Sequence, residues 1–266
     1  MGLLGQEKLI HYVDTHDLST FPRTVMLEGK EGSGRRSLCK YIGERYGLQV
    51  EDISDSLTYE KIEEINLRVQ PYLYLIDCNK LTVKNENAIL KFLEEPLKNA
   101  FIVLLTENRY SQITTIRNRC HLLCMAKYTR DQLEGFITDK ENSAVILTIC
   151  ETPGDIIKMQ SHPIKDMLDL CIKIFDKIGL ASFANTLTLS NNIAYKNEKD
   201  KYDFKIFFKA LLYISNCRAV HNELNAVAEY MLTSDYYNRS LVRNVDKRYL
   251  FENYLIQLKR MRGVVN

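Results

Sequence analysis

The sequence predicts an α/β protein with a doubly wound, five-stranded parallel sheet, followed by a C-terminal region built only of helices. Continuous apolar runs such as residues 72–76 and 101–105 are typical of strands buried on both faces of a parallel sheet. Segments with helical periodicity separate these runs, and this alternation favours the α/β class. Beyond residue 163, apolar side chains recur at helical spacing without further strand signals.

Length and composition describe an ordinary globular protein. The 266 residues can form two or three domains, and their content of 45% apolar and 26% charged residues is that of a soluble chain. No apolar run approaches the roughly 20 residues that a bilayer-spanning helix needs, and residues 1–10 lack the features of a secretory signal. We therefore expect a cytoplasmic protein without a membrane partner.

The strands and their flanking helices follow from local patterns. A short amphipathic helix is expected at Gln6–Val13, ahead of the first strand. Thr58 is a suitable N-cap for a helix whose Ile62, Ile65 and Val69 would face inward. The five expected strands, of which the second is an edge strand, are Thr24–Glu28, Leu48–Ile53, Tyr72–Asp77, Phe101–Thr106 and His121–Met125.

A glycine-rich loop joins the first strand to the next helix. Strand, glycine-rich loop and helix together are the setting of a phosphate-binding loop, in which backbone N–H groups converge on phosphate oxygens. Its lysine then reaches the β- and γ-phosphates, and the following Ser or Thr hydroxyl holds magnesium. The glycines of this loop are Gly29, Gly32 and Gly34.

Two arginines replace the polar residues of that motif. Aligned on the glycines, Arg35 occupies the lysine position and Arg36 the hydroxyl position, where a guanidinium cannot bind a cation. Sliding the motif by one residue brings Ser37 to the hydroxyl position, but it disturbs the glycine spacing. We therefore expect a degenerate nucleotide-binding loop that does not support hydrolysis, while weak binding of ATP or ADP stays open.

The third strand and the helix that follows it carry the most distinctive residues. Asp77 ends the strand at the edge of the sheet where α/β proteins bind ligands, and Cys78 follows it. In the next helix Ala88, Ile89, Phe92 and Leu93 share one face, and Pro96 ends the helix. Glu94 and Glu95 lie in the last turn, where the helix dipole disfavours carboxylates. Nothing nearby in the sequence compensates for them.

These residues carry a resemblance to a known family. The segment NAILKFLEEP, preceded by a strand ending in Asp and followed by TIRNRC, resembles the clamp-loader family of AAA+ proteins. In that family an NALLKTLEEP-type helix lies between the Walker B strand and an SRC motif that carries an arginine finger. Within the family, the chain is most similar to the delta-prime type of bacterial DNA polymerase III. The resemblance implies an AAA+ domain over residues 1–127, a helical lid over 128–162 and a helical collar domain over 163–266.

The resemblance also assigns roles to single residues. Asp77 would be the Walker B-like aspartate, but Cys78 stands where the family has the glutamate that activates water, and a thiol cannot replace a carboxylate there. Asp155 stands at the position of the sensor 2 arginine. Arg119 matches the arginine finger, which would act in trans on a neighbour's nucleotide, although the preceding serine of the motif is Asn118 here. A surface arginine paired with a carboxylate is the alternative for Arg119.

The cysteines indicate neither disulfides nor a metal site. Seven cysteines are scattered along the chain, an odd number that argues against a disulfide framework. Cys120 and Cys124 have the spacing of half a zinc site, but no second pair of ligands lies nearby. Residues 40–72 contain no cysteine, so the four-cysteine zinc module found in related subunits is absent.

The resemblance implies a non-hydrolysing subunit of the DNA polymerase III holoenzyme, with no cofactor of its own. It would assemble with gamma/tau-type and delta-type subunits, contact the sliding clamp and DNA through that assembly, and offer Arg119 to an adjacent ATPase subunit. The net charge of +2 agrees with DNA contact that is shared among subunits. Two alternatives remain: an active AAA+ ATPase with an unusual loop, and a stand-alone regulator that binds nucleotide or DNA.

Overall fold

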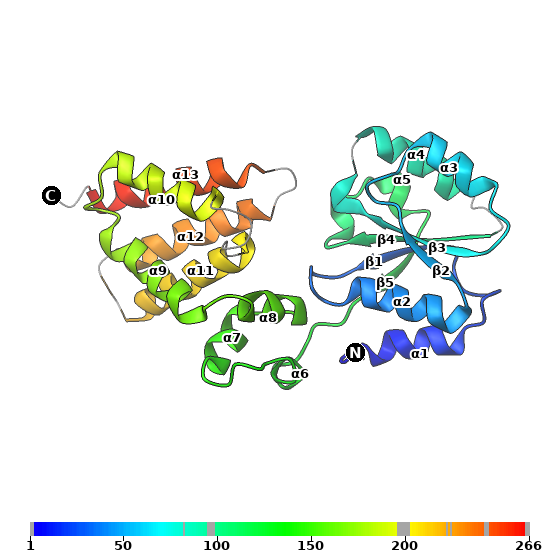
Figure 1. Cartoon of the computed structure of the whole chain (residues 1–266), viewed down its shortest axis with the longest axis horizontal. Coiled ribbons are helices and arrows are strands. Elements are labelled where there is room, and N and C mark those ends of the chain that lie inside the picture. The colour runs from blue at the N-terminus through cyan, green and yellow to red at the C-terminus, as the bar shows by residue number, and fades with distance from the viewer. Residues whose placement is uncertain are drawn as a thin grey trace. The chain divides into compact units, whose positions relative to one another are not determined.

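The computed structural model describes residues 3–81, 83–94, 99–195, 203–221, 223, 225–241 and 245–263. The chain divides into two compact units. The first comprises Met1–Gln132 and Thr152–Gly154, and the second comprises Leu133–Glu151 and Asp155–Asn266 (Figure 1). The three-domain division with boundaries at residues 127 and 162 stays a prediction.

A parallel sheet forms the centre of the first unit and confirms the predicted α/β fold. Its strands lie in the order β2-β3-β4-β1-β5, and every neighbouring pair is parallel. Asp77 pairs with Leu105, and Glu28 pairs with Thr106, so both acidic residues lie at the carboxyl edge of the sheet. The strands are β1 (Thr24–Glu28), β2 (Gln49–Asp52), β3 (Tyr72–Asp77), β4 (Ala100–Thr106) and β5 (His121–Cys124).

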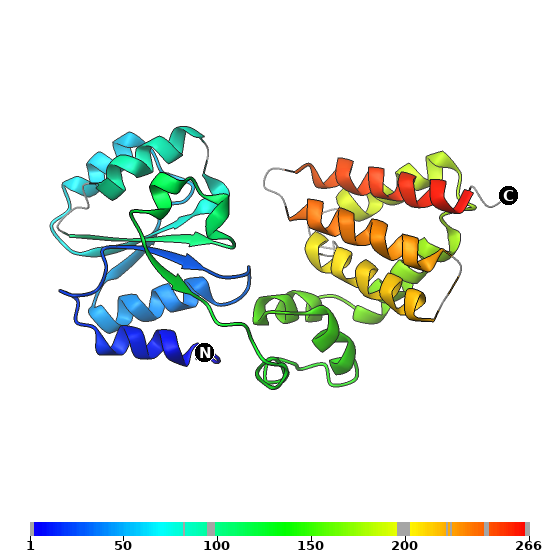
Figure 2. The ribbon, with the colours of Figure 1, turned by 180° about the vertical axis from the view of Figure 1, so that it is seen from behind.

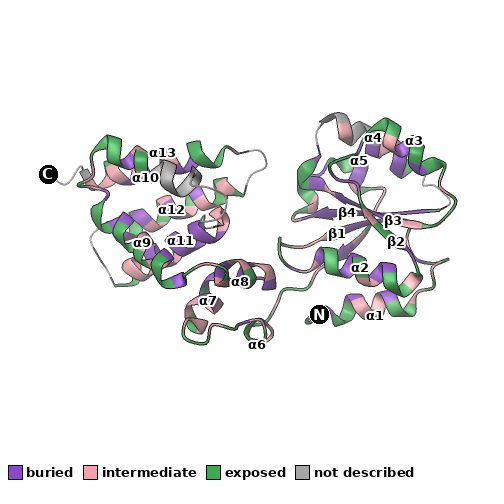
Figure 3. Ribbon diagram, in the orientation of Figure 1, coloured by how far each residue is buried: buried purple, intermediate pink, exposed green. Residues whose placement is uncertain are grey.

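Helices cover both faces of this sheet (Figures 1 and 2). On one face, α1 (Glu7–Thr15) and α2 (Arg35–Tyr46) pack on a cluster that includes Val25 and Leu27 of β1. The other face is covered by α3 (Tyr59–Asn66), α4 (Val83–Glu94) and α5 (Thr114–Arg117), and its cluster includes Met26 of β1. Successive residues of β1 thus enter different cores, which is why the central strands are apolar on both sides (Figure 3).

The end of α3 differs from the prediction. Thr58 does cap the helix, since its Oγ1 accepts a hydrogen bond from the Lys61 amide at 3.1 Å. Val69, however, is 84% exposed, because α3 ends at Asn66 and Val69 lies in the connection to β3. The expectation that Val69 faces inward was therefore wrong. Pro96, predicted to end the following helix, lies outside the described residues, as does Glu95.

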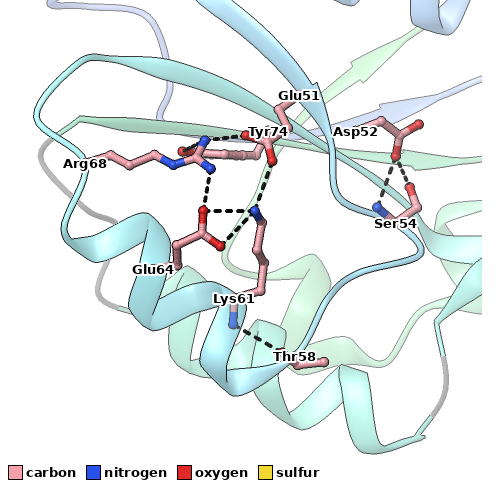
Figure 4. A network of polar contacts seen from close by, with 8 residues as sticks. All are labelled: Glu51, Asp52, Ser54, Thr58, Lys61, Glu64, Arg68 and Tyr74. Atoms are coloured by element: carbon pink, nitrogen blue, oxygen red, sulfur yellow. Dashed lines mark hydrogen bonds and ion pairs between the residues drawn. The ribbon is translucent and has the colours of Figure 1, made fainter.

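A polar network connects α3 to the edge of the sheet (Figure 4). Lys61 lies 3.1 Å from carboxylate oxygens of both Glu51 and Glu64. Arg68 pairs with the same two carboxylates, and its guanidinium lies 4.8 Å from the centre of the Tyr72 ring. Burial would raise the pKa of Glu51, but hydrogen bonds from Arg68 and Lys61 lower it below its usual value. Alternating charges thereby cover the exposed strand β2.

The second unit is helical in its described part, which confirms the prediction for the C-terminal region. Rings of Phe207, Phe208, Phe251 and Tyr254 meet in its core, and all four side chains are fully buried. None of the helices in the described ranges is long and apolar enough to cross a membrane. The helices, of which α6 and α8 begin in the first unit, are α6 (Arg130–Glu134), α7 (Ser143–Ile149), α8 (Pro153–Gln160), α9 (Ile164–Lys177), α10 (Phe183–Tyr195), α11 (Phe204–Val220), α12 (Ala226–Ser240) and α13 (Lys247–Gly263).

Candidate functional site

The glycine-rich loop lies between β1 and α2, at the carboxyl edge of the sheet. Gly32 and Gly34 have φ angles of +78° and +93°, in the left-handed region that glycine adopts without strain. The Gly29 amide donates to the carbonyl of Thr106 at 2.9 Å and so joins the start of the loop to the end of β4. The loop therefore contains two left-handed backbone positions, and both are occupied by glycine.

The segment Thr152–Gly154 packs directly on this loop. The Gly154 amide donates to the Gly32 carbonyl at 3.0 Å, and Thr152 Oγ1 donates to the Glu31 carbonyl at 3.1 Å. A Cβ atom on Gly154 would lie only 2.4 Å from the Gly32 Cα atom. The two backbones can therefore approach this closely only because both residues are glycine.

Two polar side chains of the loop are buried with unused hydrogen-bonding capacity. Ser33 is 3% exposed and Arg35 is 8% exposed. Among the described residues, neither Ser33 Oγ nor Arg35 Nη1 has a hydrogen-bond partner. Buried donors are normally paired, so a hydroxyl and a guanidinium in this state could accept an anionic oxygen as a partner.

Arg36 lies against the carboxylate that ends β3. Its Nη2 atom is 3.6 Å from Asp77 Oδ2, and its Nη1 atom also pairs with Asp52. The other Asp77 oxygen accepts a hydrogen bond from the Asn79 amide at 3.0 Å. A fixed positive charge thus lies beside Asp77, and it would repel a divalent cation from this carboxylate.

Ser54 joins Asp52 to the same site (Figure 4). Its hydroxyl donates to Asp52 and accepts a hydrogen bond from the Asp77 amide at 2.8 Å. Burial would raise the pKa of Asp52, but hydrogen bonds from Ser54 and Arg36 lower it below the usual range. Sequence reasoning had singled out neither Asp52 nor Ser54. The signal that was available is that Asp52 ends the strand next to β3, with which it is in register.

Cys78 does not lie in the open site. Its side chain is fully buried and belongs to the apolar cluster on the α4 side of the sheet. The polar end of β3 is therefore the carboxylate of Asp77 alone. A buried thiol in apolar surroundings is a poor general base, because burial disfavours the thiolate.

Arg119 is held by the helix that precedes it. Its Nη2 atom donates to Glu94 Oε1 at 2.7 Å, and its Nη1 atom donates to the Thr115 carbonyl at 2.7 Å. The side chain is 35% exposed. Glu94, which breaks the dipole rule at the end of α4, therefore has its partner in the segment that carries Arg119.

Asp155 is neutralised inside the second unit. Its side chain is 9% exposed and lies 2.7 Å from Lys209 Nζ, which is 7% exposed. Burial would lower the pKa of Lys209, but the Asp155 carboxylate raises it above its usual value. Asp155 is thus half of a buried ion pair.

The cysteines considered for zinc take different roles. Cys124 is exposed, and its Sγ atom donates to Glu28 Oε2 at 3.5 Å. Cys120 is partly buried against the apolar cluster beneath α4, which raises its pKa to about 12. Within the described residues no group of three or more His, Cys, Asp or Glu side chains could hold a metal ion.

A family model and a curated relative match part of this chain. A family model described as "DNA polymerase III, delta subunit" matches residues 48–129, a range that includes Asp77, Glu94 and Arg119. DNA polymerase III subunit delta' of Bacillus subtilis (strain 168) is 33% identical over 78 residues, which are 29% of this chain and 24% of that protein. The chain is thus matched over about a quarter of the curated relative's length.

A solved structure extends the likeness in fold to nearly the whole chain. The DNA polymerase III gamma subunit-related protein of Thermotoga maritima superposes with a TM-score of 0.55 over 97% of this chain and 99% of that one. The sequences are 15% identical, so this comparison is evidence for the fold alone. It agrees with a parallel α/β domain followed by a helical C-terminal region.

Proposed function

We propose that this chain, a clamp-loader protein of the delta-prime type, is a subunit of a DNA polymerase III clamp loader that does not itself hydrolyse ATP. The observation that carries the proposal is the ion pair between Arg36 and Asp77, at 3.6 Å. It supports a loop in which an arginine neutralises the carboxylate that would otherwise assist a bound magnesium ion. The burial of Cys78 supports the same conclusion, because no carboxylate follows Asp77 to activate water.

Arg119 is the residue through which the subunit would contribute to catalysis in its neighbour. It is partly exposed, and it lies at the end of the segment matched by the family model. An arginine supplied in trans stabilises the charge that develops on the transferred phosphoryl group. The ion pair with Glu94 keeps the guanidinium ordered at the surface, where a second subunit could approach it.

The partners follow from the type of protein. We infer assembly with ATP-hydrolysing gamma/tau-type subunits and a delta-type subunit, to load the sliding clamp on DNA during replication. Contact with the clamp and DNA would be made through the assembly. A weak affinity for ATP or ADP is a second property that we propose for the loop, because Ser33 and Arg35 are buried with unused donors.

Two measurements test this function. The isolated chain should show no ATP turnover above a buffer control, and turnover that Asp77→Asn abolishes would instead favour an active ATPase. In a reconstituted loader, Arg119→Ala should lower clamp- and DNA-stimulated hydrolysis, by up to roughly 10³-fold at the adjacent site, without loss of assembly. Arg119→Lys should restore only part of the rate, since an ammonium lacks the planar fork. An unchanged rate with Arg119→Ala would exclude the trans-acting role.

A further inference from the structure

Tyr110 is an exposed ring flanked by two arginines. It is 70% exposed, and it lies in the short 3-10 helix η2 (Arg109–Ser111) that follows β4. The guanidinium of Arg109 is 5.1 Å from the ring centroid, and that of Arg117 is 5.2 Å from it. Exposed aromatic rings with arginines stacked on them are typical of surfaces that bind anionic ligands.

The three arginines of this segment differ in their counter-charges. Arg119 is paired with Glu94 at 2.7 Å, and Arg109 lies 3.8 Å from Glu28. Arg117 forms no ion pair with any carboxylate in the part of the chain that the structure describes. Its positive charge is therefore uncompensated there.

Arg117 is nevertheless well oriented. Its Nη2 atom donates to Thr114 Oγ1 at 2.9 Å, and its guanidinium stacks on Tyr110. Its Nε atom is buried and has no hydrogen-bond partner among the described residues. An oriented, unpaired guanidinium can accept an anion without breaking an ion pair, whereas Arg119 must first give up Glu94.

Arg117 is also close to Arg119 along the chain. Two residues of extended chain span at most about 7 Å, so an anion that reaches Arg119 comes within reach of the long Arg117 side chain. A nucleoside triphosphate carries several negative charges, more than a single guanidinium can balance. A polyphosphate that binds at Arg119 is long enough to contact both arginines, although their side chains have different partners within the chain.

We propose that Arg117, oriented by Tyr110 and Thr114, is a second anion-binding residue that contacts the polyphosphate of the nucleotide bound by the adjacent subunit. The proposal rests on the trans-acting role of this segment given under the proposed function. In this proposal Arg117 contacts the standing charge of the polyphosphate and so binds the ground state and the transition state about equally. Arg119 acts on the charge that develops during the reaction. The two side chains therefore affect different kinetic constants.

The experiment is steady-state ATP hydrolysis by the reconstituted loader with clamp and primed DNA. Arg117→Ala should raise KM for ATP about fivefold, as expected for one partly exposed charge pair, and leave kcat within about twofold. Arg117→Gln, which removes the charge but keeps a polar side chain with hydrogen-bond donors, should give the same result and serves where the Ala variant assembles poorly. Tyr110→Ala should raise KM in part, and Tyr110→Phe should not, because the ring remains.

Arg45→Ala is the matched control. Arg45 stacks on Tyr46 at 5.6 Å in the same unit, but it lies 3.7 Å from Asp14 and is therefore neutralised. This variant should leave both constants unchanged. If Arg119→Ala lowers kcat while Arg117→Ala leaves KM unchanged, the inference about Arg117 is wrong and the proposed function stands. If neither variant has an effect, the trans-acting role given under the proposed function fails as well. Weaker DNA binding by the Arg117→Ala loader at an unchanged KM would assign Arg117 to nucleic acid and overturn the inference.

Discussion

The guanidinium of Arg36 lies 3.6 Å from the carboxylate of Asp77, so the glycine-rich loop neutralises the acidic end of β3 with its own side chain. In a phosphate-binding loop the position of Arg36 is taken by Ser or Thr, whose hydroxyl holds magnesium. In this chain the positive charge beside Asp77 belongs to the side chain of Arg36 rather than to a bound metal ion. A metal is therefore not needed to balance Asp77.

Replacing Arg36 should make nucleotide binding depend on magnesium. In the unmodified chain, a fluorescent ADP should bind equally well in Mg²⁺ and in EDTA, because the guanidinium occupies the place of the cation. Arg36→Ser should bind the nucleotide more tightly with Mg²⁺ than with EDTA, as judged by fluorescence anisotropy. The double variant Arg36→Ser/Asp77→Asn should lose that difference. Equal affinities for Arg36→Ser in the two buffers would contradict this account of the site.

The contact between Gly32 and Gly154 should not tolerate a side chain. In Gly154→Ala the new Cβ would lie 2.4 Å from the Gly32 Cα atom, and the backbones must separate. We expect a loss of about 1–3 kcal/mol in the free energy of unfolding, measured by urea denaturation. Gly179→Ala is the control, because its Cβ would meet only side-chain atoms of Arg262, the nearest at 3.1 Å. Equal free energies of unfolding for the two variants would show that the two backbones can separate without loss of stability.

Removing Lys209 should destabilise the second unit. Lys209→Met removes the cation beside the buried Asp155 carboxylate, and breaking a buried ion pair on one side typically costs about 3–5 kcal/mol. The double variant Lys209→Met/Asp155→Leu should recover most of that loss, since an apolar pair of similar volume carries no buried charge. Urea denaturation at neutral pH followed by circular dichroism measures both. A double variant as unstable as Lys209→Met would mean that packing, rather than charge, sets the cost.

The same pair predicts how stability depends on pH. The Asp155 carboxylate outweighs burial and raises the pKa of Lys209 above the usual value of about 10.4. A base with a raised pKa in the folded state contributes its full stabilisation below its unfolded pKa, and the contribution is lost as the pH rises through the folded value. The free energy of unfolding should therefore fall above about pH 10.4, and this part of the fall should be missing in Lys209→Met.

Glu94 should modulate Arg119 and nothing else. Both side chains are partly exposed, so Glu94→Gln should change the free energy of unfolding by less than about 1 kcal/mol. In the reconstituted loader, it should raise kcat for ATP hydrolysis by up to about fivefold, since Arg119 no longer has to leave a carboxylate. In an Arg119→Ala background the same substitution should have no effect. Asp55→Asn is the control. It removes another exposed ion pair of the first unit, the one with Lys80, and should change neither stability nor ATP hydrolysis. An effect of Glu94→Gln that persists without Arg119 would refute this coupling.

The fold was largely predictable because its signals are local. Continuous apolar runs identified the buried strands, and the predicted edge strand Leu48–Ile53, which is not an apolar run, contains the observed β2 at Gln49–Asp52. A cap was also recognisable, since Thr58 accepts a hydrogen bond from the Lys61 amide at 3.1 Å at the start of α3. Val69 was misplaced because an apolar residue at helical spacing gives no sign that the helix has already ended.

The charge pairs of the site could not be predicted, because each joins residues far apart in the sequence. Glu94 was recognisable as unfavourable at a helix end, but Arg119, its partner, is 25 residues away. Asp155 was recognised as a charge in an unusual place, while Lys209 lies 54 residues further on. Sequence patterns thus reveal the residue that breaks a local rule, whereas the compensating partner is defined only by the fold.

The contact between Thr152–Gly154 and the glycine-rich loop also determines when this loop can be completed during synthesis of the chain. Thr152 and Glu31, which are joined by a hydrogen bond in this contact, are 121 residues apart. At a synthesis rate of about 5–20 residues per second, the loop waits for roughly 6–24 s before its partner segment exists. Although it is among the first parts of the first unit to leave the ribosome, the loop is therefore among the last to be completed.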